Sequence, residues 1–236
     1  MMPIPIPYCG AAPFPSDWLT QWNLDPGVLA LLLAGAFVLK HAGSGIPAWI
    51  GLASLFLLFV SPLCALSSAL FSIRVTHHVI LTALTAPLLA FALPHARGRL
   101  AAWTLAHAAI FWAWHMPQAY ALALANDAVY WAMQASLLGS AICLWRAVRG
   151  ASAPAAVAAL LATMVQMGLL GALLTFSGTP LYGWHAATTQ AWGLTPLADQ
   201  QLAGLIMWVP GSGLYLAAAL WLANDWLGER QRPAAA

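Results

Sequence analysis

Long stretches without a single charged residue recur along this chain, and they constrain its fold more than any other feature. Eight Lys or Arg and six Asp or Glu are the charged residues among 236, a share of 6%, whereas a water-soluble domain carries about a quarter. The mean hydropathy is +0.80, so the exterior of the folded chain cannot be mostly hydrated. We therefore expect an all-α, polytopic membrane protein surrounded by the lipid bilayer.

Seven apolar segments approach or exceed the roughly 20 residues that a helix needs to cross the hydrocarbon core. They occupy residues 27–42, 46–67, 72–93, 99–116, 127–147, 154–176 and 199–223. Pro62, Pro87 and Pro210 fall inside three of them, where the missing N–H predicts kinks. The pattern predicts a seven-helix transmembrane bundle over 27–223, an extended Pro-rich segment over 1–26 before it, and a tail over 224–236.

The positive charges predict the direction of crossing. Of the eight cations, only Arg74 does not follow an odd-numbered segment. Because cytoplasmic loops are enriched in Lys and Arg, we expect the N-terminus outside and the tail in the cytoplasm. The seven cations concerned are Lys40, Arg97, Arg99, Arg146, Arg149, Arg230 and Arg232. They form no clustered basic face, so nucleic acid is not an expected partner.

The remaining sequence signals are mostly negative. Cys9, Cys64 and Cys143 are far apart and form no CxxC pair, so they indicate neither a disulfide framework nor a zinc site, and we expect small apolar fillers. The Pro-rich segment lacks the basic region of a cleaved signal peptide, so we expect it to be retained. No activated nucleophile, acid–base pair of carboxylates or phosphate-binding glycine loop stands out, which argues against an enzyme.

Side chains that bind soft metals recur at one depth of the predicted bundle. Counted inward from the outer end at about 1.5 Å per residue, five spans each offer an imidazole or a thioether about 9 to 13 Å deep. These residues are His78, His107, Met133, Met167 and Met207. Such a set with few carboxylates favours Cu(I) over Mg, Ca or Mn. Gap-filling by Met and structural burial of His are the alternatives.

Three further side chains lie closer to the outer surface of the predicted bundle. His77 neighbours His78 on the same helix, rotated by about 100°. His115 precedes Met116-Pro117 at the outer mouth, either as an entrance ligand or as an interfacial anchor. Asp199 begins the last span, either as a carboxylate near the entrance or as a helix cap.

Two alternatives to metal binding concern the helix faces. Arg74 shares a face with His78 four residues later, so the two could make a simple polar contact. Gln200, Ala203, Gly204 and Met207 form a small and polar stripe at helical spacing on the last span. A stripe of this kind predicts close packing against another helix.

Three motifs together resemble the CtaG-type cytochrome c oxidase assembly factors. Residues 196–210, PLADQQLAGLIMWVP, resemble the DQ-x-LAG-x-x-MW-x-P segment of that family. Trp114-His115-Met116-Pro117 resembles its WH-x-P turn, and His78 with the apolar run that follows, through Ala86-Pro87-Leu88-Leu89, resembles its third-span motif. Where many members have His-Met-x-x-His, this chain has Arg74-Val75-Thr76-His77-His78, which lacks one His and one Met.

The resemblance implies a non-enzymatic assembly factor for a haem–copper oxidase in the bacterial plasma membrane. Its implied partners are oxidase subunits and a periplasmic copper donor. Together with the depth pattern it predicts a Cu(I) cavity lined by His78, His107, Met167 and Met207, with His77, His115 and Asp199 nearer the entrance.

Three other functions stay open. One is a b-type cytochrome with His78 and His107 as axial haem ligands, and another is a metal-free membrane chaperone. The third is a transporter in which the last span unwinds near Pro210. A retinal protein is excluded because the only lysine, Lys40, lies at the inner end of the first span.

Overall fold

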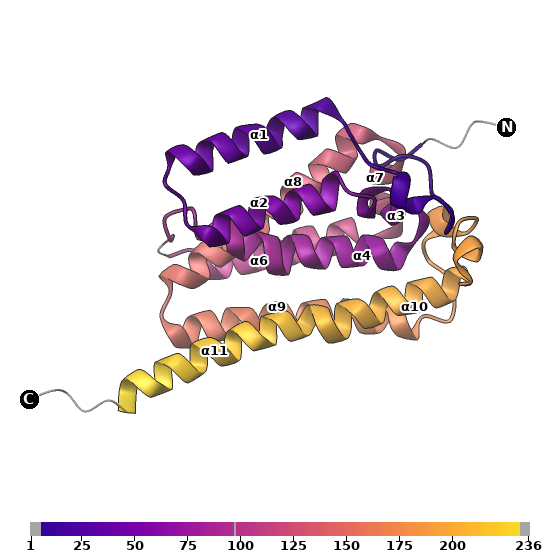
Figure 1. The fold of residues 1–236 in the computed structure, drawn as a ribbon. Coiled ribbons are helices and arrows are strands. Elements are labelled where there is room, and N and C mark those ends of the chain that lie inside the picture. Colours follow the sequence, from indigo (N-terminus) through magenta and orange to yellow (C-terminus); the bar gives the residue numbers. More distant parts are fainter. Residues whose placement is uncertain (1–5, 97, 232–236) are drawn as a thin grey trace, which may run out of the picture.

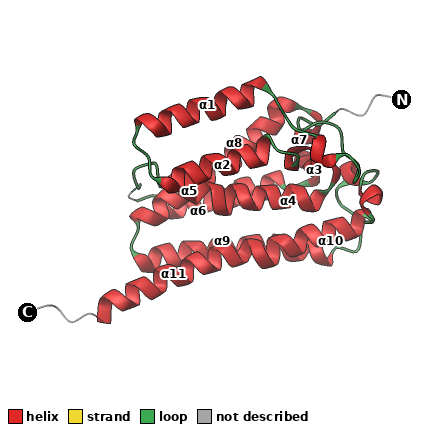
Figure 2. Cartoon of the chain, in the orientation of Figure 1, coloured by secondary structure: helices red, strands yellow, loops and turns green. Residues whose placement is uncertain are grey.

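The computed structural model describes residues 6–96 and 98–231, and only the backbone of 229–231. In this part of the chain the regular structure is helical and no strand forms (Figures 1 and 2). The predicted all-α class is confirmed. The α-helices are α1 (Pro26–His41), α2 (Ile46–Phe59), α3 (Leu63–Ala69), α4 (Phe71–Val79), α5 (Ala86–Ala90), α6 (Leu100–Trp114), α7 (Pro117–Ala125), α8 (Asp127–Gly150), α9 (Ala153–Phe176), α10 (Pro196–Ile206) and α11 (Ser212–Gln231).

Shorter turns join or interrupt these helices. Two are π-helical, η2 (Ile80–Thr85) between α4 and α5, and η5 (Met207–Gly211) between α10 and α11. Three are 3₁₀ turns: η1 (Trp18–Thr20), η3 (Gly183–His185) and η4 (Thr189–Trp192). Parts of three predictions lie outside the described residues. These are residues 1–5 of the predicted N-terminal segment, Arg97 of the predicted charge pattern, and residues 232–236 of the predicted tail.

Several helices are long and apolar enough to cross a membrane. Four qualify by length and hydropathy: Phe71–Ala90, Asp127–Gly150, Ala153–Phe176 and Pro196–Gly228. The bent pair α2 and α3 makes a fifth if it is one span. The apolar helices α1 and α6 have 16 and 15 residues, which is short of the usual span. The protein is thus a multi-pass membrane protein with four or five spans by length in the described residues, and the count of seven stays a prediction.

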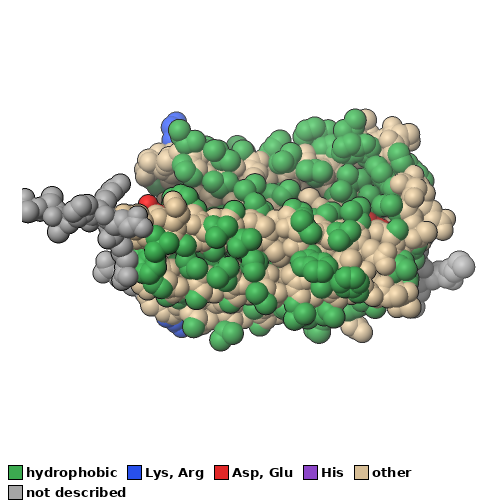
Figure 3. Space-filling model, turned by 90° about the horizontal axis from the view of Figure 1, so that it is seen from below, with side chains coloured by type: hydrophobic (Ala, Val, Ile, Leu, Met, Phe, Trp, Pro, Cys, Tyr) green, Lys and Arg blue, Asp and Glu red, His purple; other side chains and the backbone are tan. Residues whose placement is uncertain are grey.

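The helices lie side by side, and the loops gather at the two ends of the bundle (Figure 1). One end, which we call the N-terminal end, carries residues 6–25, α3, α7 and the loop 177–195. At the opposite end Arg146 and Arg149 donate hydrogen bonds to the carbonyl groups of Pro94 and Ala90, so they cap the chain where α5 ends. On the face in Figure 3, apolar side chains extend from end to end, and the Lys and Arg in view lie at the end opposite the N-terminal end.

The three prolines predicted to kink their spans act in two ways. Pro62 stands at the break between α2 and α3, which bend by 47°. Pro87 follows the π-helical turn η2, and Pro210 lies inside the π-helical turn η5. A π turn widens the helix locally, so the proline ring and the lost donor are accommodated without a sharp break.

Close packing of α9 on α10 confirms the small-residue stripe. A Cβ at Gly204 would lie 2.6 Å from the carbonyl oxygen of Gly171, and a Cβ at Gly171 would lie 2.8 Å from that of Gly204. Neither distance leaves room for a methyl group, so the two backbones touch. This contact fixes the first part of the last span against α9.

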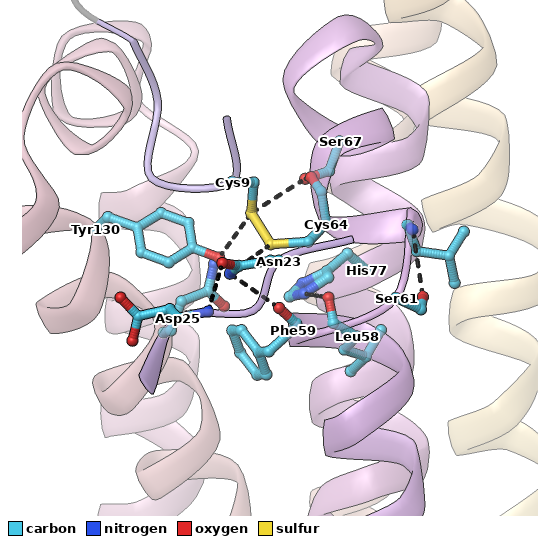
Figure 4. Close-up of a disulfide and its surroundings, with 12 residues drawn as sticks. Cys9, Asn23, Asp25, Leu58, Phe59, Ser61, Cys64, Ser67, His77 and Tyr130 are labelled. Atoms are coloured by element: carbon cyan, nitrogen blue, oxygen red, sulfur yellow. Dashed lines mark hydrogen bonds between the residues drawn. A yellow bond between two sulfur atoms is a disulfide. The ribbon is translucent and has the colours of Figure 1, made fainter. Parts of the chain in front are cut away.

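A disulfide joins Cys9 to Cys64 and corrects the expectation that these cysteines are apolar fillers (Figure 4). Cys143 is free and half-buried. The N-terminal segment folds back over the bundle, where Tyr8 stacks on Tyr130 of α8 with ring centroids 4.9 Å apart. Cys9 thereby reaches α3 across a sequence separation of 55 residues. Sequence spacing carries no signal of such a contact.

Candidate functional site

Two histidines from different helices meet inside the N-terminal end of the bundle. His78 lies on α4, and His115 immediately follows α6, where Pro117 begins α7. Their ring centroids are 5.9 Å apart and the rings are nearly perpendicular. Nδ1 of His115 donates to the carbonyl oxygen of Phe111 at 2.7 Å, because the backbone acceptor lies one turn earlier on α6. The lone pair of His115 is therefore on Nε2.

Gln134 of α8 completes the surroundings of His78. Its Nε2 donates to Nε2 of His78 at 3.3 Å. Nδ1 of His78 and Oε1 of Gln134 are buried without a hydrogen-bond partner. A predicted contact between His78 and Arg74 does not form as a hydrogen bond. His78 thus has one ring nitrogen without a protein partner.

His77 points in another direction, as the helical rotation predicts. Its Nε2 lies 3.2 Å from the carbonyl oxygen of Leu58, and its ring meets the edge of Phe59 at 5.0 Å. Nδ1 is buried and has no partner. The two neighbouring histidines therefore lie on different sides of α4: His78 faces α8 and His115, whereas His77 faces the end of α2.

His107 is not brought to this pair. Its Nδ1 lies 2.9 Å from the Ser140 hydroxyl of α8, two turns from His115 along α6. The Phe111 ring lies between the two histidine rings, 6.2 Å from His107 and 4.4 Å from His115. Hydrogen bonding and aromatic packing account for the position of His107.

The predicted methionine ligands pack in the core. Met133, Met167 and Met207 are fully buried. Met167 packs against the turn η5, since a Cβ at Gly211 would lie 3.1 Å from its Sδ. Among the described residues no group of three or more His, Cys, Asp or Glu side chains could hold a metal ion. A metal site among these residues would therefore have to be built from two imidazoles, or from imidazoles together with methionine sulfur.

Asp199 caps a helix, but not its own. From α10 its carboxylate accepts hydrogen bonds from the backbone N–H groups of Phe71 and Ser72 at 2.7 and 3.2 Å, and from the Ser72 hydroxyl. These groups form the N-terminus of α4, where a negative charge is favourable. Asp199 thus fixes the start of the helix that carries His77 and His78.

Arg74 is a buried charged residue that the sequence indicated only as a neighbour of His78. Its side chain is fully buried, with the hydroxyls of Tyr120 and Tyr130 as polar neighbours, and none of its three nitrogens makes a hydrogen bond of good geometry. The guanidinium carbon lies 5.4 Å from the centre of the Tyr130 ring. A buried guanidinium without a counter-ion is costly, and a lone Arg inside an apolar span was the signal that could have found it.

His185 had no role in the sequence prediction. It lies in the loop 177–195, and its Nε2 is 2.7 Å from the Tyr120 hydroxyl of α7. Burial, and then the charge of Arg74, lower the pKa of His185 to about 3. Tyr182 of the same loop donates its hydroxyl to the His115 carbonyl at 2.7 Å and stacks on Phe71. The loop therefore closes the N-terminal end over the histidine pair.

Comparison with known proteins supplies the family. A family model described as cytochrome c oxidase caa3 assembly factor matches residues 98–229, more than half of the chain. The chain belongs to this family. The match to the caa3 assembly factors covers α6 to α11 and includes His115 and Asp199, but it begins after Arg74, His77, His78 and both cysteines of the disulfide. No curated protein and no solved structure matches the chain.

Proposed function

We propose that this protein assists the assembly of a haem–copper cytochrome c oxidase in the bacterial plasma membrane, without being an enzyme. The observation that carries the proposal is the family match over α6 to α11, which includes the WH-x-P turn with His115 and the segment that begins at Asp199. Oxidase subunits are its partners in this proposal, and a periplasmic copper donor supplies the metal.

The proposed topology has seven spans, with the N-terminus outside. The disulfide supports this direction, because disulfides persist in the oxidising periplasm and are rare in the cytoplasm. Lys40, Arg146 and Arg149 are at the opposite end, as the positive-inside rule requires. The short helices α1 and α6 then cross with the help of their flanking residues.

The proposed cargo of the protein is Cu(I), held by His78 and His115. A ligand nitrogen lies about 2 Å from such an ion and about 1 Å from the ring centre, so two imidazoles that bind one ion from opposite sides have centroids about 6 Å apart. The observed 5.9 Å matches this value. Turning the Gln134 amide by 180° would let its oxygen accept from Nε2 of His78 and leave Nδ1 free as a ligand.

Arg74 makes the proposed copper binding transient. The positive charge of Arg74 acts on His78 and opposes a permanently bound cation. An assembly factor must release its metal to the client, and a site with two imidazole ligands beside a cation suits that task.

Replacing His78 and His115 tests the proposal. In His78→Ala and His115→Ala we expect loss of the Cu(I) that copurifies under reducing conditions, and oxidase activity in membranes reduced about 10-fold or more, with normal amounts of the protein. His107→Ala is the matched control, because it removes a buried imidazole of α6 that bonds to Ser140. Copper that still copurifies with the double variant His78→Ala/His115→Ala would contradict the site.

A metal-free chaperone is the second candidate, favoured by the lack of any group of three or more ligating His, Cys, Asp or Glu side chains in the described residues. In that case the double variant would keep full oxidase activity. A Soret band in the purified protein would instead indicate a b-type cytochrome.

A further inference from the structure

Two hydrogen-bond donors and a further hydroxyl surround the sulfur atoms of the Cys9–Cys64 disulfide (Figure 4). The hydroxyl of Tyr130 donates to Sγ of Cys9 at 3.4 Å. The Ser67 hydroxyl lies 4.0 Å from the same atom but donates to the Cys64 carbonyl oxygen at 2.6 Å. Nδ2 of Asn23 approaches Sγ of Cys64 at 3.8 Å. Disulfide sulfur is a weak acceptor and gains little from such donors, whereas thiolate sulfur gains much more.

Tyr130 connects the disulfide to a buried positive charge. Tyr130 contacts Cys9 through its hydroxyl and Arg74 through its ring. The nitrogens of Arg74 make no hydrogen bond of good geometry; its polar neighbours are the neutral hydroxyls of Tyr120 and Tyr130, and no carboxylate forms an ion pair with it in the described residues. Two thiolates that hold one Cu(I) carry a net charge of −1, which would supply the missing counter-ion.

His77 is an imidazole in the surroundings of the disulfide (Figure 4). Its ring packs on Phe59, whose carbonyl oxygen accepts a hydrogen bond from Asn23. The bond between Nε2 and the Leu58 carbonyl leaves the lone pair on Nδ1, which is buried and unpaired. An imidazole with this tautomer is ready to bind a metal.

With the disulfide formed, the described residues hold no group of three His, Cys, Asp or Glu side chains that could bind a metal ion. We propose that Cys9 and Cys64 form a redox-gated Cu(I) site: once reduced, their two sulfurs hold a cuprous ion at the N-terminal end of the bundle, with Nδ1 of His77 as the third ligand. Sulfur and imidazole ligands select Cu(I) over harder cations. This site is distinct from the His78–His115 pair, and it deepens the proposed function by adding a second, redox-controlled position for the same metal.

The redox step requires a dithiol reductant. The dithiol transfers two electrons and two protons to the disulfide, whose S–S bond breaks, and the dithiol itself becomes a disulfide. Cu(I) then replaces the two thiol protons, which pass to solvent. Cys9 and Cys64 are 5% and 0% exposed, so the reductant must displace the N-terminal segment, which lies over them as coil.

Copper titration of the oxidised and reduced protein tests this site. The full-length protein in detergent is reduced with a phosphine, freed of it without oxygen, and titrated with Cu(I) against a coloured Cu(I) chelator. We expect the reduced protein to bind one ion more than the oxidised protein. X-ray absorption should show copper–sulfur scattering only in the reduced protein. His77→Ala should weaken the extra ion about 10-fold, which corresponds to 1.4 kcal/mol.

Two controls separate the possible outcomes. Cys9→Ser/Cys64→Ser should lose the extra ion, and Cys143→Ser should keep it. If the double variant does not fold, alkylation of the reduced wild-type protein replaces it. Equal binding by oxidised and reduced protein would overturn this inference and leave the His78–His115 site intact. Binding only by reduced protein would support this inference and overturn the other site.

Discussion

Asp199 shows how one side chain can determine the position of a site it does not belong to. Its three hydrogen bonds hold the N-terminus of α4. In Asp199→Ala two buried N–H groups lose their acceptor, so we expect a loss of about 1–3 kcal/mol in the free energy of unfolding. Unfolding in mixed detergent measures it. Asp127→Ala, in the exposed first turn of α8, is the control, and equal losses would contradict the capping role.

His185 is predicted to make the closure of the loop 177–195 depend on pH. Its folded-state pKa of about 3 lies below the ordinary 6.5. The stability that the neutral imidazole contributes to the folded loop is therefore complete above pH 6.5. It declines by about 1.4 kcal/mol per pH unit as the pH falls toward 3. Arg74, Tyr120 and Phe71 face the ring. Proteolysis of the loop should therefore increase between pH 6.5 and pH 4.

A glutamine at position 185 separates this effect from other histidines. The amide oxygen in His185→Gln can still accept from Tyr120, but it does not titrate. We expect the variant to show a flatter dependence of loop cleavage on pH. Parallel curves for the variant and the wild-type protein would assign the acid sensitivity to other residues.

Some candidate site residues could be predicted from the sequence and others could not. His78 and His115 were identifiable as candidate ligands because an imidazole inside a bilayer needs a partner. Their pairing was not, because depth along a span does not give the direction around the helix, and His107 at a similar depth is bonded to Ser140 instead. The Cys9–Cys64 bond and the role of His185 depend on the path of loops, for which apolar patterns carry no signal.

Among the elements, the contact between α9 and α10 is the one most sensitive to a single methyl group. In Gly204→Ala the new Cβ would lie 2.6 Å from the Gly171 carbonyl oxygen, so we expect a loss of about 1–3 kcal/mol. Gly139→Ala is the control: this exposed glycine of α8 has nothing within 4 Å of an added Cβ, and the change should stabilise the helix slightly. Similar losses in both variants would argue against close packing.

The helices themselves were largely predictable. Each predicted segment coincides with an apolar helix or bent helix pair, because runs without charge mark what lipid can surround. The differences lie at the ends: residues 224–231, predicted as tail, continue α11, and α7 is a separate short helix. Pro117 and Asn126, which start and end α7, act through local capping that hydropathy does not record.

For the whole molecule, labelling from one side of the membrane tests the proposed direction. In a Cys143→Ser background, Thr179→Cys lies in the loop of the N-terminal end and Ser152→Cys before α9 at the opposite end; both positions are exposed. In cells with a permeable outer membrane, an impermeant maleimide should label position 179 and spare 152 until the inner membrane is opened. The reverse pattern would overturn the proposed topology.

The bond between Cys9 and Cys64 encloses α1, α2 and the first two residues of α3 in one covalent ring. In the proposed topology the chain leaves one surface of the membrane and returns to it within this ring, so α1 and α2 would insert as a pair. Both sulfurs emerge from the ribosome before α4 does. Oxidation can therefore lock this first hairpin during translation, before either histidine of the pair is made.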